Sequence, residues 1–442
     1  MKRKLLLFLS AYTLFFFLLA CRKHYCMNSN EGDNAAIANF YWQTLHGHFW
    51  FSTYFNENHL RIHLTLLSVL ALPLYVICPR METLFLFNSA TIAASGYPFW
   101  LICRRVLGRD EAAWAMTVAY LFFPPVVTNH VDQVGFEQLA LPCLFWAFYW
   151  LQEAKFRPFI GWLALSTLAL ENIILTLTGF AAYSLIRRKG WKWVAGPLVL
   201  VAVYALVVFG LWLHPLTQYL GSLNPLVIFS PDRLLYLAEL LSPLMVVTPF
   251  LTLDCVFALP ALGMNLVMGE SSFRVIAWHY NPTVGAMLCL ASASAIAKFG
   301  KQPTQRACLS LILACCSLVS WPQWFSPSDY TLPPEWPAMK HAINLIPPAA
   351  SVVAPHAMTA HFANRDSNAV LAVFAPKPMF TGGGWPFEAL YKMNFVILDA
   401  NERRIPSDSP TQELFDGLLK HGYRLVFNES GVLVLQGPGG RP

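Results

Sequence analysis

Residues 5–21 read LLLFLSAYTLFFFLLAC, an uninterrupted apolar run directly after the basic start Met1 to Lys4. A helix of about this length can cross a bilayer, and a basic flank predicts that the N-terminus stays in the cytoplasm. Residues 22–82 are then the first extracytoplasmic loop, and two acids in it, Glu31 and Asp33, stand just outside the membrane. These two carboxylates are the first candidates for chemistry at a membrane surface.

The composition indicates a polytopic α-helical membrane protein. The chain is 56% hydrophobic and 12% charged, so most residues must face lipid or other helices, since a soluble domain would not be solvated with so few charges. The net charge of +6 comes from short basic groups between apolar runs. This pattern is typical of cytoplasmic loops and excludes a continuous basic stripe for nucleic acid.

Ten further apolar segments predict membrane spans. They lie near 83–103, 112–128, 137–151, 158–170, 172–186, 194–213, 237–252, 254–268, 281–297 and 307–321. The block 158–186 would be roughly 43 Å long as one helix, which exceeds a bilayer core of about 30 Å. Its strongly polar point is Glu171-Asn172, so we expect two short helices that meet there at an extracytoplasmic turn.

The segment 62–78 is long enough to span, but it contains His63 and a central Pro73. If it lies in the interface, the basic groups at 104–109, 155–157, 187–192 and 298–306 all fall in the cytoplasm. If it spans, these groups change sides and the positive-inside bias reverses. We therefore predict about eleven spans, with 62–78 at the outer interface.

After the helical domain of residues 1–322, residues 323–442 predict a Pro-rich linker and a small α/β domain. Eleven spans from a cytoplasmic start place this domain outside the membrane. Helix-like patterns occur at 338–346 and 411–421, and strand-like patterns at 351–354, 369–374, 394–399, 424–427 and 432–435.

A second element is predicted in the first loop. Residues 34–46 place Ile37, Phe40, Tyr41 and Leu45 on one helix face, and such an aromatic-rich helix is expected to lie in the headgroup layer. Asp33 would be its N-cap. Capping and catalysis are compatible, because a cap also fixes the position of the carboxylate.

These segments resemble a known family. The stretch from Asp33 reads DNAAIANFYW, and further matching pieces are His46-Gly47, Asn58-His59, Gln133–Pro142, Leu170–Asn172, Pro260–Asn265, His279–Pro282 and Ile346–Ser351. Their order and spacing resemble the bacterial domain of unknown function 2079 family, whose members look like the GT-C superfamily of membrane glycosyltransferases. The sequence departs from that pattern at Ala38, Asn58, Leu170 and Asn172, where the family usually has Asp, Asp, Lys and Asp.

The resemblance implies an activity and a site. Similar GT-C enzymes place an acidic pair in the first extracytoplasmic loop and use a polyprenyl-phosphate-linked sugar as donor. By resemblance, Asp33 is the catalytic base and Glu31 is its partner or a metal ligand. The cations expected near the donor phosphate, where they would stabilise the developing dianion, are Arg61, Arg274 and His279. Arg274 can equally be an interfacial arginine.

Two further acids have alternative interpretations. Glu137 belongs to the family's acidic loop, or it is a first-turn glutamate favoured by the helix dipole. A carboxylate at Glu171 is costly inside a membrane and therefore indicates a functional role or a water-filled cavity.

A metal site is a further hypothesis. His59 and His63 are four residues apart, and on one helix face they could bind a divalent metal with Glu31 or Asp33. They can also be aromatic-like interface residues. The cofactor is therefore left open, with a divalent metal as the candidate.

Two classes of function follow. The first is a glycosyltransferase of the bacterial inner membrane that acts on a lipid-phosphate-linked sugar and an extracytoplasmic acceptor. The second is a non-catalytic transporter or lipid-handling scaffold on a degenerate GT-C-like fold. The polar groups gather on one side of the membrane, which favours the first class; the departures at the acidic positions favour the second. The sequence gives neither the sugar nor a protein partner.

Overall fold

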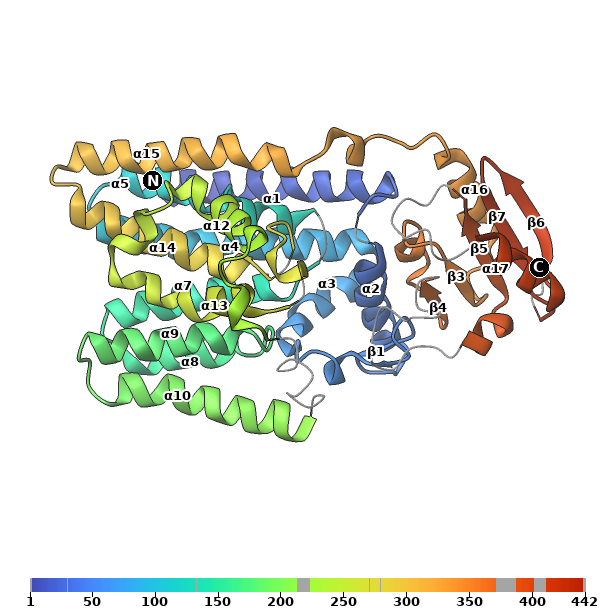
Figure 1. The fold of residues 1–442 in the computed structure, drawn as a ribbon, viewed down its shortest axis with the longest axis horizontal. Helices are drawn as coiled ribbons and strands as arrows, with labels where there is room; N and C mark the ends of the chain where they lie inside the picture. The colour runs from blue at the N-terminus through green and yellow to red at the C-terminus, as the bar shows by residue number, and fades with distance from the viewer. Residues whose placement is uncertain are drawn as a thin grey trace. The chain divides into compact units, whose positions relative to one another are not determined.

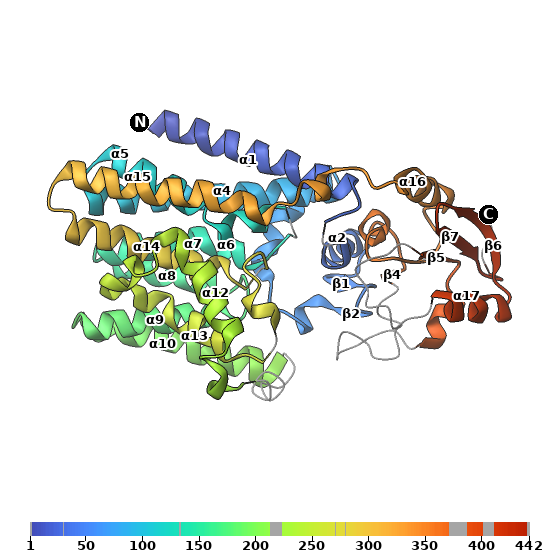
Figure 2. The same cartoon turned by 45° about the horizontal axis from the view of Figure 1, so that its top comes forward.

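The structure is a computed structural model that describes residues 2–29, 31–131, 134–212, 223–269, 271–278, 280–370, 387–400 and 411–439. The chain forms two compact units, whose elements are labelled in Figures 1 and 2. Unit 1 comprises Met1–Phe17, Ile62–Leu70 and Leu86–Ser326, and unit 2 comprises Leu18–Arg61, Ala71–Phe85 and Pro327–Pro442. Each unit is described by itself.

Unit 1 is helical, because long apolar runs without internal polar groups satisfy their backbone hydrogen bonds within each helix. Its α-helices are α1 (Lys2–Tyr25), α4 (Met81–Leu107), α5 (Asp110–Leu121), α6 (Pro124–Val127), α7 (Ala140–Gln152), α8 (Phe156–Ser166), α9 (Ile173–Ile186), α10 (Lys192–Tyr204), α12 (Pro231–Leu241), α13 (Leu259–Val267), α14 (Pro282–Phe299) and α15 (Pro303–Ser320). The first residues of α4 and the last of α1 belong to unit 2.

Four of the described helices are long and apolar enough to cross a membrane: Lys2–Tyr25, Lys192–Gly210, Pro282–Phe299 and Pro303–Trp324. The third of these, α14, is 78% buried, whereas α10 is only 22% buried and presents its apolar side chains outward. Small residues allow neighbouring segments to pack closely against α14. At Gly285, for example, an added Cβ would lie only 2.9 Å from the Phe123 ring. The total of eleven spans remains a prediction.

Two predicted spans, 237–252 and 254–268, are not continuous α-helices. The helix α12 ends at Leu241, and short 3-10 turns fill the chain until α13 begins at Leu259. Pro243 and Pro249 explain the break, since proline lacks the backbone N–H that an α-helix interior needs.

The predicted split of the 158–186 block is confirmed. The helix α8 ends at Ser166 and α9 begins at Ile173, so Glu171 and Asn172 lie in the turn between them. The segment 62–78 contains a 3-10 helix, Leu66–Ala71, and a short α3, Leu72–Ile77, with Pro73 in its first turn. This apolar stretch of 66–77 is shorter than a bilayer needs.

Unit 2 is built on a five-stranded sheet with the order β4-β3-β5-β7-β6. Its strands are β3 (Val352–Ala354), β4 (Asn368–Val370), β5 (Phe395–Asp399), β6 (Arg424–Glu429) and β7 (Val432–Gln436), with helices α16 (Trp336–Leu345) and α17 (Thr411–Lys420). β3 is parallel to β4 and β5, and β7 is antiparallel to both of its neighbours. These elements confirm the α/β pattern predicted for the C-terminal residues; positions 371–374 of the predicted second strand lie outside the described residues.

Part of the first loop belongs to this same unit. It supplies α2 (Glu31–Leu45) and a small hairpin of β1 (Phe51–Ser52) and β2 (Glu57–Asn58). One sheet face packs Val353, Val396 and Leu435 against Ala35, Ala36 and Tyr54, and the other packs against α16. Unit 2 therefore joins the predicted first loop to the predicted C-terminal domain.

Two predictions about α2 are wrong. Its aromatic-rich face does not insert into a headgroup layer, because Ile37, Phe40 and Tyr41 are all buried in unit 2. It also begins at Glu31, so Asp33 lies within its first turn and is not the N-cap. A carboxylate in the first turn still interacts favourably with the helix dipole.

Candidate functional site

The catalytic candidate Asp33 lies half-buried beside a tightly packed backbone position. A Cβ on the preceding Gly32 would lie 2.7 Å from His356 Nε2 and 2.8 Å from the Tyr54 hydroxyl oxygen. Only glycine allows these two side chains to approach the first turn of α2 so closely. Tyr54 and His356 therefore form a polar group at the first turn of α2, where Asp33 lies.

The phenol in this group stays neutral. Burial raises the pKa of Tyr54 well above its usual value, and the negative charge of Asp33 raises that pKa further. A neutral phenol can donate a hydrogen bond, and the neighbouring carboxylate can accept a proton. The group therefore contains both a proton acceptor and a donor, as acid–base chemistry requires.

Other candidates of the first loop have different surroundings. Arg61 is 65% exposed and makes a long ion pair, 3.7 Å from its Nε to Glu57 Oε1. His59 is buried and stacks on the Phe40 ring, with ring centroids 4.9 Å apart. The side chain of Glu31 and all of His279 lie outside the described residues.

The metal hypothesis requires His59 and His63 to lie on one face of a helix, and the structure does not contain such a helix. His59 belongs to a three-residue 3-10 helix that ends at Arg61, so His59 and His63 do not share an α-helix face. Among the described residues, no group of three or more His, Cys, Asp or Glu side chains is arranged to hold a metal ion.

Unit 1 contains a second polar group around Glu137, which is only 1% exposed. Glu137 Oε1 accepts a 2.8 Å hydrogen bond from the backbone N–H of Thr283, in the first turn of α14, and its Oε2 accepts a 2.8 Å bond from Asn172 Nδ2. The helix dipole that favours this carboxylate is therefore that of α14, not that of the helix following Glu137. The carboxylate joins α14 to the turn between α8 and α9.

The neighbouring Glu171 is paired with His63. Their Nδ1 and Oε1 atoms are 2.5 Å apart, and the Glu171 side chain is 12% exposed. Its other carboxylate oxygen is buried and makes no hydrogen bond within the part of the chain that the structure describes. The 170–172 turn, which the sequence singled out, thus brings Glu137, Glu171, Asn172 and His63 together.

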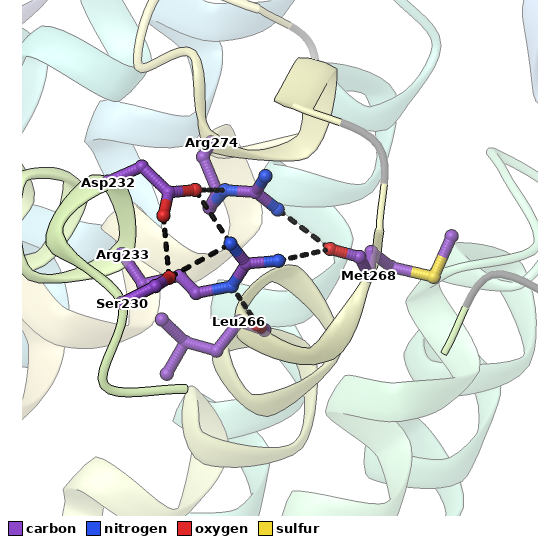
Figure 3. A network of polar contacts seen from close by, with 6 residues as sticks. All are labelled: Ser230, Asp232, Arg233, Leu266, Met268 and Arg274. Atoms are coloured by element: carbon purple, nitrogen blue, oxygen red, sulfur yellow. Dashed lines mark hydrogen bonds and ion pairs between the residues drawn. The ribbon is translucent and has the colours of Figure 1, made fainter. Parts of the chain in front are cut away.

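A third group holds Arg274, as Figure 3 shows. Arg274 Nε lies 3.1 Å from Asp232 Oδ2, and its Nη1 donates a 2.7 Å hydrogen bond to the Met268 carbonyl oxygen. Arg233 binds the same two partners, and Ser230 accepts a further bond from Arg233. A hydrogen bond from Ser230, together with the two arginines, lowers the pKa of Asp232 to about 2. The cluster is charged at any physiological pH.

The two later family-like segments also meet. Asn265 Nδ2 donates 3.2 Å hydrogen bonds to Asn281 Oδ1 and to the carbonyl oxygen of Tyr280. Tyr236 donates to the same Asn281 oxygen at 2.8 Å. Sequence reasoning did not identify Tyr236, and it also missed Asp232, Arg233, Thr283, Tyr54 and His356. Asp232 and Arg233 bind each other directly, but the contacts that join them to Arg274 and Met268, like the partners of Tyr236 and Thr283, are distant in the chain and leave no local pattern.

The fold has solved relatives. Over 99% of both chains, the structure superposes on ArnT from Cupriavidus metallidurans bound to undecaprenyl phosphate, with a TM-score of 0.63 and 11% sequence identity. The apo state of the same protein gives a TM-score of 0.57 at 10% identity, over 98% of this chain and 99% of that one. The chain therefore has a fold similar to that of ArnT.

The family follows from the sequence. The chain belongs to the DUF2079 family of predicted membrane proteins, whose pattern it matches over residues 23–434. This confirms the resemblance predicted from the first-loop motifs. No curated protein sequence matches the chain.

Proposed function

We propose that this protein is a glycosyltransferase of the bacterial inner membrane. It would move a sugar from a polyprenyl-phosphate-linked donor to an extracytoplasmic acceptor, with Asp33 as the base. One observation carries the proposal: the fold matches, over almost the full length of both chains, a structure that was solved with undecaprenyl phosphate. A polyprenyl phosphate is the lipid that such a donor leaves behind after transfer.

The surroundings of Asp33 support its role as the base. Asp33 is half-buried in the first turn of α2, and Gly32 lets Tyr54 and His356 pack close to this turn. A buried helix holds its first turn rigidly, so the carboxylate is positioned before a substrate binds. Prepositioned groups are what proton transfer requires.

The proposed step transfers the sugar between two oxygen atoms. The acceptor hydroxyl oxygen attacks C1 of the sugar while its proton moves to the Asp33 carboxylate. The bond between C1 and the phosphate oxygen breaks, and its electron pair stays on the phosphate, which leaves as polyprenyl phosphate. A cation near this leaving group stabilises its second negative charge.

Arg61 is the better supported of the described phosphate-binding candidates. Its ion pair with Glu57 is long and exposed, and such a pair contributes little, so the guanidinium can reorient. Arg274 is held by Asp232 and by the Met268 carbonyl, with only 7% of its side chain exposed. A phosphate would have to replace Asp232 to reach it.

The decisive variant is Asp33→Asn. It keeps the size of the side chain and removes its charge and basicity, so we expect transfer to fall by about 10²–10⁴-fold. The assay supplies undecaprenyl phosphate loaded with radiolabelled hexoses or pentoses to membranes containing matched amounts of each protein. It measures the release of free undecaprenyl phosphate, which is common to every sugar.

The exposed Asp366 provides a matched control in the same unit, and Asp366→Asn should keep full activity. Wild-type rates for a folded Asp33→Asn protein would exclude Asp33 as the base.

A complete lack of transfer by the wild type with every loaded lipid would favour the non-catalytic alternative. The hydrogen bonds of Glu137 fit that alternative. Both of its carboxylate oxygens accept bonds from protein groups, so the side chain has a structural role.

A further inference from the structure

Two turns of unit 1 carry an unusual concentration of positive charge. The turn between α7 and α8, the turn between α9 and α10, and the first residues of α8 and α10 together carry six cations: Lys155, Arg157, Arg187, Arg188, Lys189 and Lys192. Five of them are exposed, and Lys189 is half-buried. Neither turn belongs to the groups around Asp33, Glu137 or Arg274.

Both turns have the same backbone geometry. Ala154 and Arg188 have positive φ angles of 54° and 50°, which end the helices before them. The next N–H reaches back five residues in each case, from Lys155 to the Trp150 carbonyl at 3.1 Å and from Lys189 to the Ser184 carbonyl at 2.9 Å. This is the Schellman type of helix end, and it places one lysine at the equivalent position of each turn.

The two turns are neighbours within unit 1. Lys189 Nζ lies 3.4 Å from the carbonyl oxygen of Leu151, at the end of α7. The Trp193 ring of α10 packs against the rings of Phe156 and Phe159 of α8, with centroids 5.3 and 5.1 Å apart. Figure 1 shows both turns at the same end of the α7, α8, α9 and α10 helices. The six cations therefore form one surface, which we call the basic surface.

Aromatic rings hold several of these cations in place. Lys155 lies over Trp150, Lys189 over Trp193 and Lys192 over Phe156, with 5.0, 5.4 and 5.5 Å from Nζ to the ring centroid. Cation–π contacts neutralise no charge, so they orient the ammonium groups and leave them able to bind an anion.

Acidic groups balance only part of the basic surface: Asp254 lies close enough to Arg187 to interact with its charge. Within the two turns the sequence has one acid, Glu153, and its carboxylate is paired with Arg105 of α4. Partial burial and the charge of Arg187 lower the pKa of Lys189. The positive charges of Lys189 and Arg187 repel each other, and a bound anion would relieve this repulsion.

Apolar surface begins directly beside the basic surface. The segment Lys192–Gly210 is apolar enough to cross a membrane and is only 22% buried. Trp191 is 82% exposed, and Leu198 and Val199, one to two turns further along α10, are 45% and 57% exposed. An anion that binds here therefore meets hydrocarbon surface on the same helix.

We propose that the basic surface binds the headgroup of an anionic phospholipid, with its acyl chains lying along the exposed face of α10. The phosphate would contact Lys155, Lys189 and Lys192, and Trp191 would lie at the level of the glycerol. The apolar face of α10 favours a lipid over a soluble anion, because a free phosphate gains nothing from it. Clusters of Lys and Arg at the end of a membrane helix are attractive to anionic lipids.

The test uses the full-length protein, delipidated in a non-ionic detergent. Native mass spectrometry would measure the retention of dioleoylphosphatidylglycerol and dioleoylphosphatidylcholine across a titration. We expect the wild type to prefer phosphatidylglycerol. The combined variant Lys155→Gln, Lys189→Gln and Lys192→Gln should lose about fivefold in affinity for each charge that contacts the headgroup, and its affinity for phosphatidylcholine should stay unchanged.

Three controls make the test specific. Lys340→Gln removes an exposed lysine that lies over Trp336 at 4.9 Å in unit 2, and it should change nothing. Replacing the same three lysines by arginine should preserve binding. Leu198→Ser combined with Val199→Ser should weaken phosphatidylglycerol binding without removing any charge, which keeps the proposal testable if the lysine variant does not fold.

Two results would overturn the proposal. The first is unchanged phosphatidylglycerol affinity in a folded lysine-to-glutamine variant. The second is competition by inorganic phosphate or glycerol 1-phosphate at the same concentration as the lipid, since this would identify a site for soluble anions.

Discussion

Single buried residues in this protein join segments that are far apart in the sequence. Glu137 and Thr283 are 146 positions apart, yet the carboxylate of Glu137 satisfies a backbone N–H at the start of α14 and the amide of Asn172. Nothing near Glu137 in the sequence indicates either partner. From the sequence, Glu137 is part of an acidic loop that resembles the family's, or a first-turn glutamate, but its role depends on α14, which contacts it only after folding.

The first prediction concerns the stability of this group. Glu137→Ala leaves the Thr283 N–H and the Asn172 amide buried without their acceptor, which costs about 1–3 kcal/mol for each donor. Glu137→Gln keeps one acceptor oxygen and should cost less. The measurement is the thermal unfolding of fluorescent-protein fusions, followed by size-exclusion chromatography in detergent. Equal melting temperatures for wild type and Glu137→Ala would contradict this role.

At the scale of elements, α2 shows what a pattern can and cannot predict. The spacing of Ile37, Phe40 and Tyr41 correctly predicted a helix, because an apolar face at a period of 3.6 residues is a local property. It did not predict the environment, since an aromatic-rich face suits a headgroup layer and a protein core equally well. The rings of Phe40 and Tyr41 pack against those of Trp50, His59 and Tyr75. The neighbouring Ala35 and Ala36 pack against strands more than 300 residues away. The alternation of helix-like and strand-like patterns in the C-terminal residues, in contrast, needed no partner to predict an α/β domain.

The second prediction tests the attachment of α2. Asn39 is fully buried; its Nδ2 donates to the carbonyls of Ala363 and Arg365 at 2.8 and 3.1 Å, and its Oδ1 accepts from Thr53. Asn39→Leu should destabilise unit 2 by at least about 2 kcal/mol, because several buried polar groups lose their partner. Limited proteolysis should then cleave the C-terminal residues faster.

The exposed Asn428 on β6 offers the matched control for that experiment. Asn428→Leu makes the same chemical change at the surface, and it should leave the proteolysis rate within a factor of two. Protection of the C-terminal residues in Asn39→Leu would mean that α2 does not depend on these hydrogen bonds.

At the scale of the whole molecule, the prediction is topological. Eleven spans from a cytoplasmic start place residue 430 outside the membrane and residue 190 in the cytoplasm. In intact cells, a single cysteine replacing Ser430 should react with a membrane-impermeant thiol reagent, and one replacing Gly190 should not. The ten native cysteines must be removed first, since Cys78, Cys308 and Cys315 are exposed and free.

The opposite labelling pattern would invert the topology. It would place Asp33 on the cytoplasmic side and remove the support for an extracytoplasmic acceptor. The binding of a phospholipid at the basic surface would be unaffected, because both leaflets contain phospholipid. The two proposals can therefore fail independently.

The make-up of unit 2 has a consequence for biosynthesis. Its core combines residues 18–61 with residues 327–442, so the ribosome adds roughly 270 residues after Arg61 before it reaches Pro327. At about 5–20 residues per second, this takes roughly 15–50 s. During that interval Ala35, Ala36 and Tyr54 lack the sheet residues against which they pack in the finished protein. The nascent first loop therefore needs temporary shelter, from the membrane surface or a chaperone, until the end of the chain arrives.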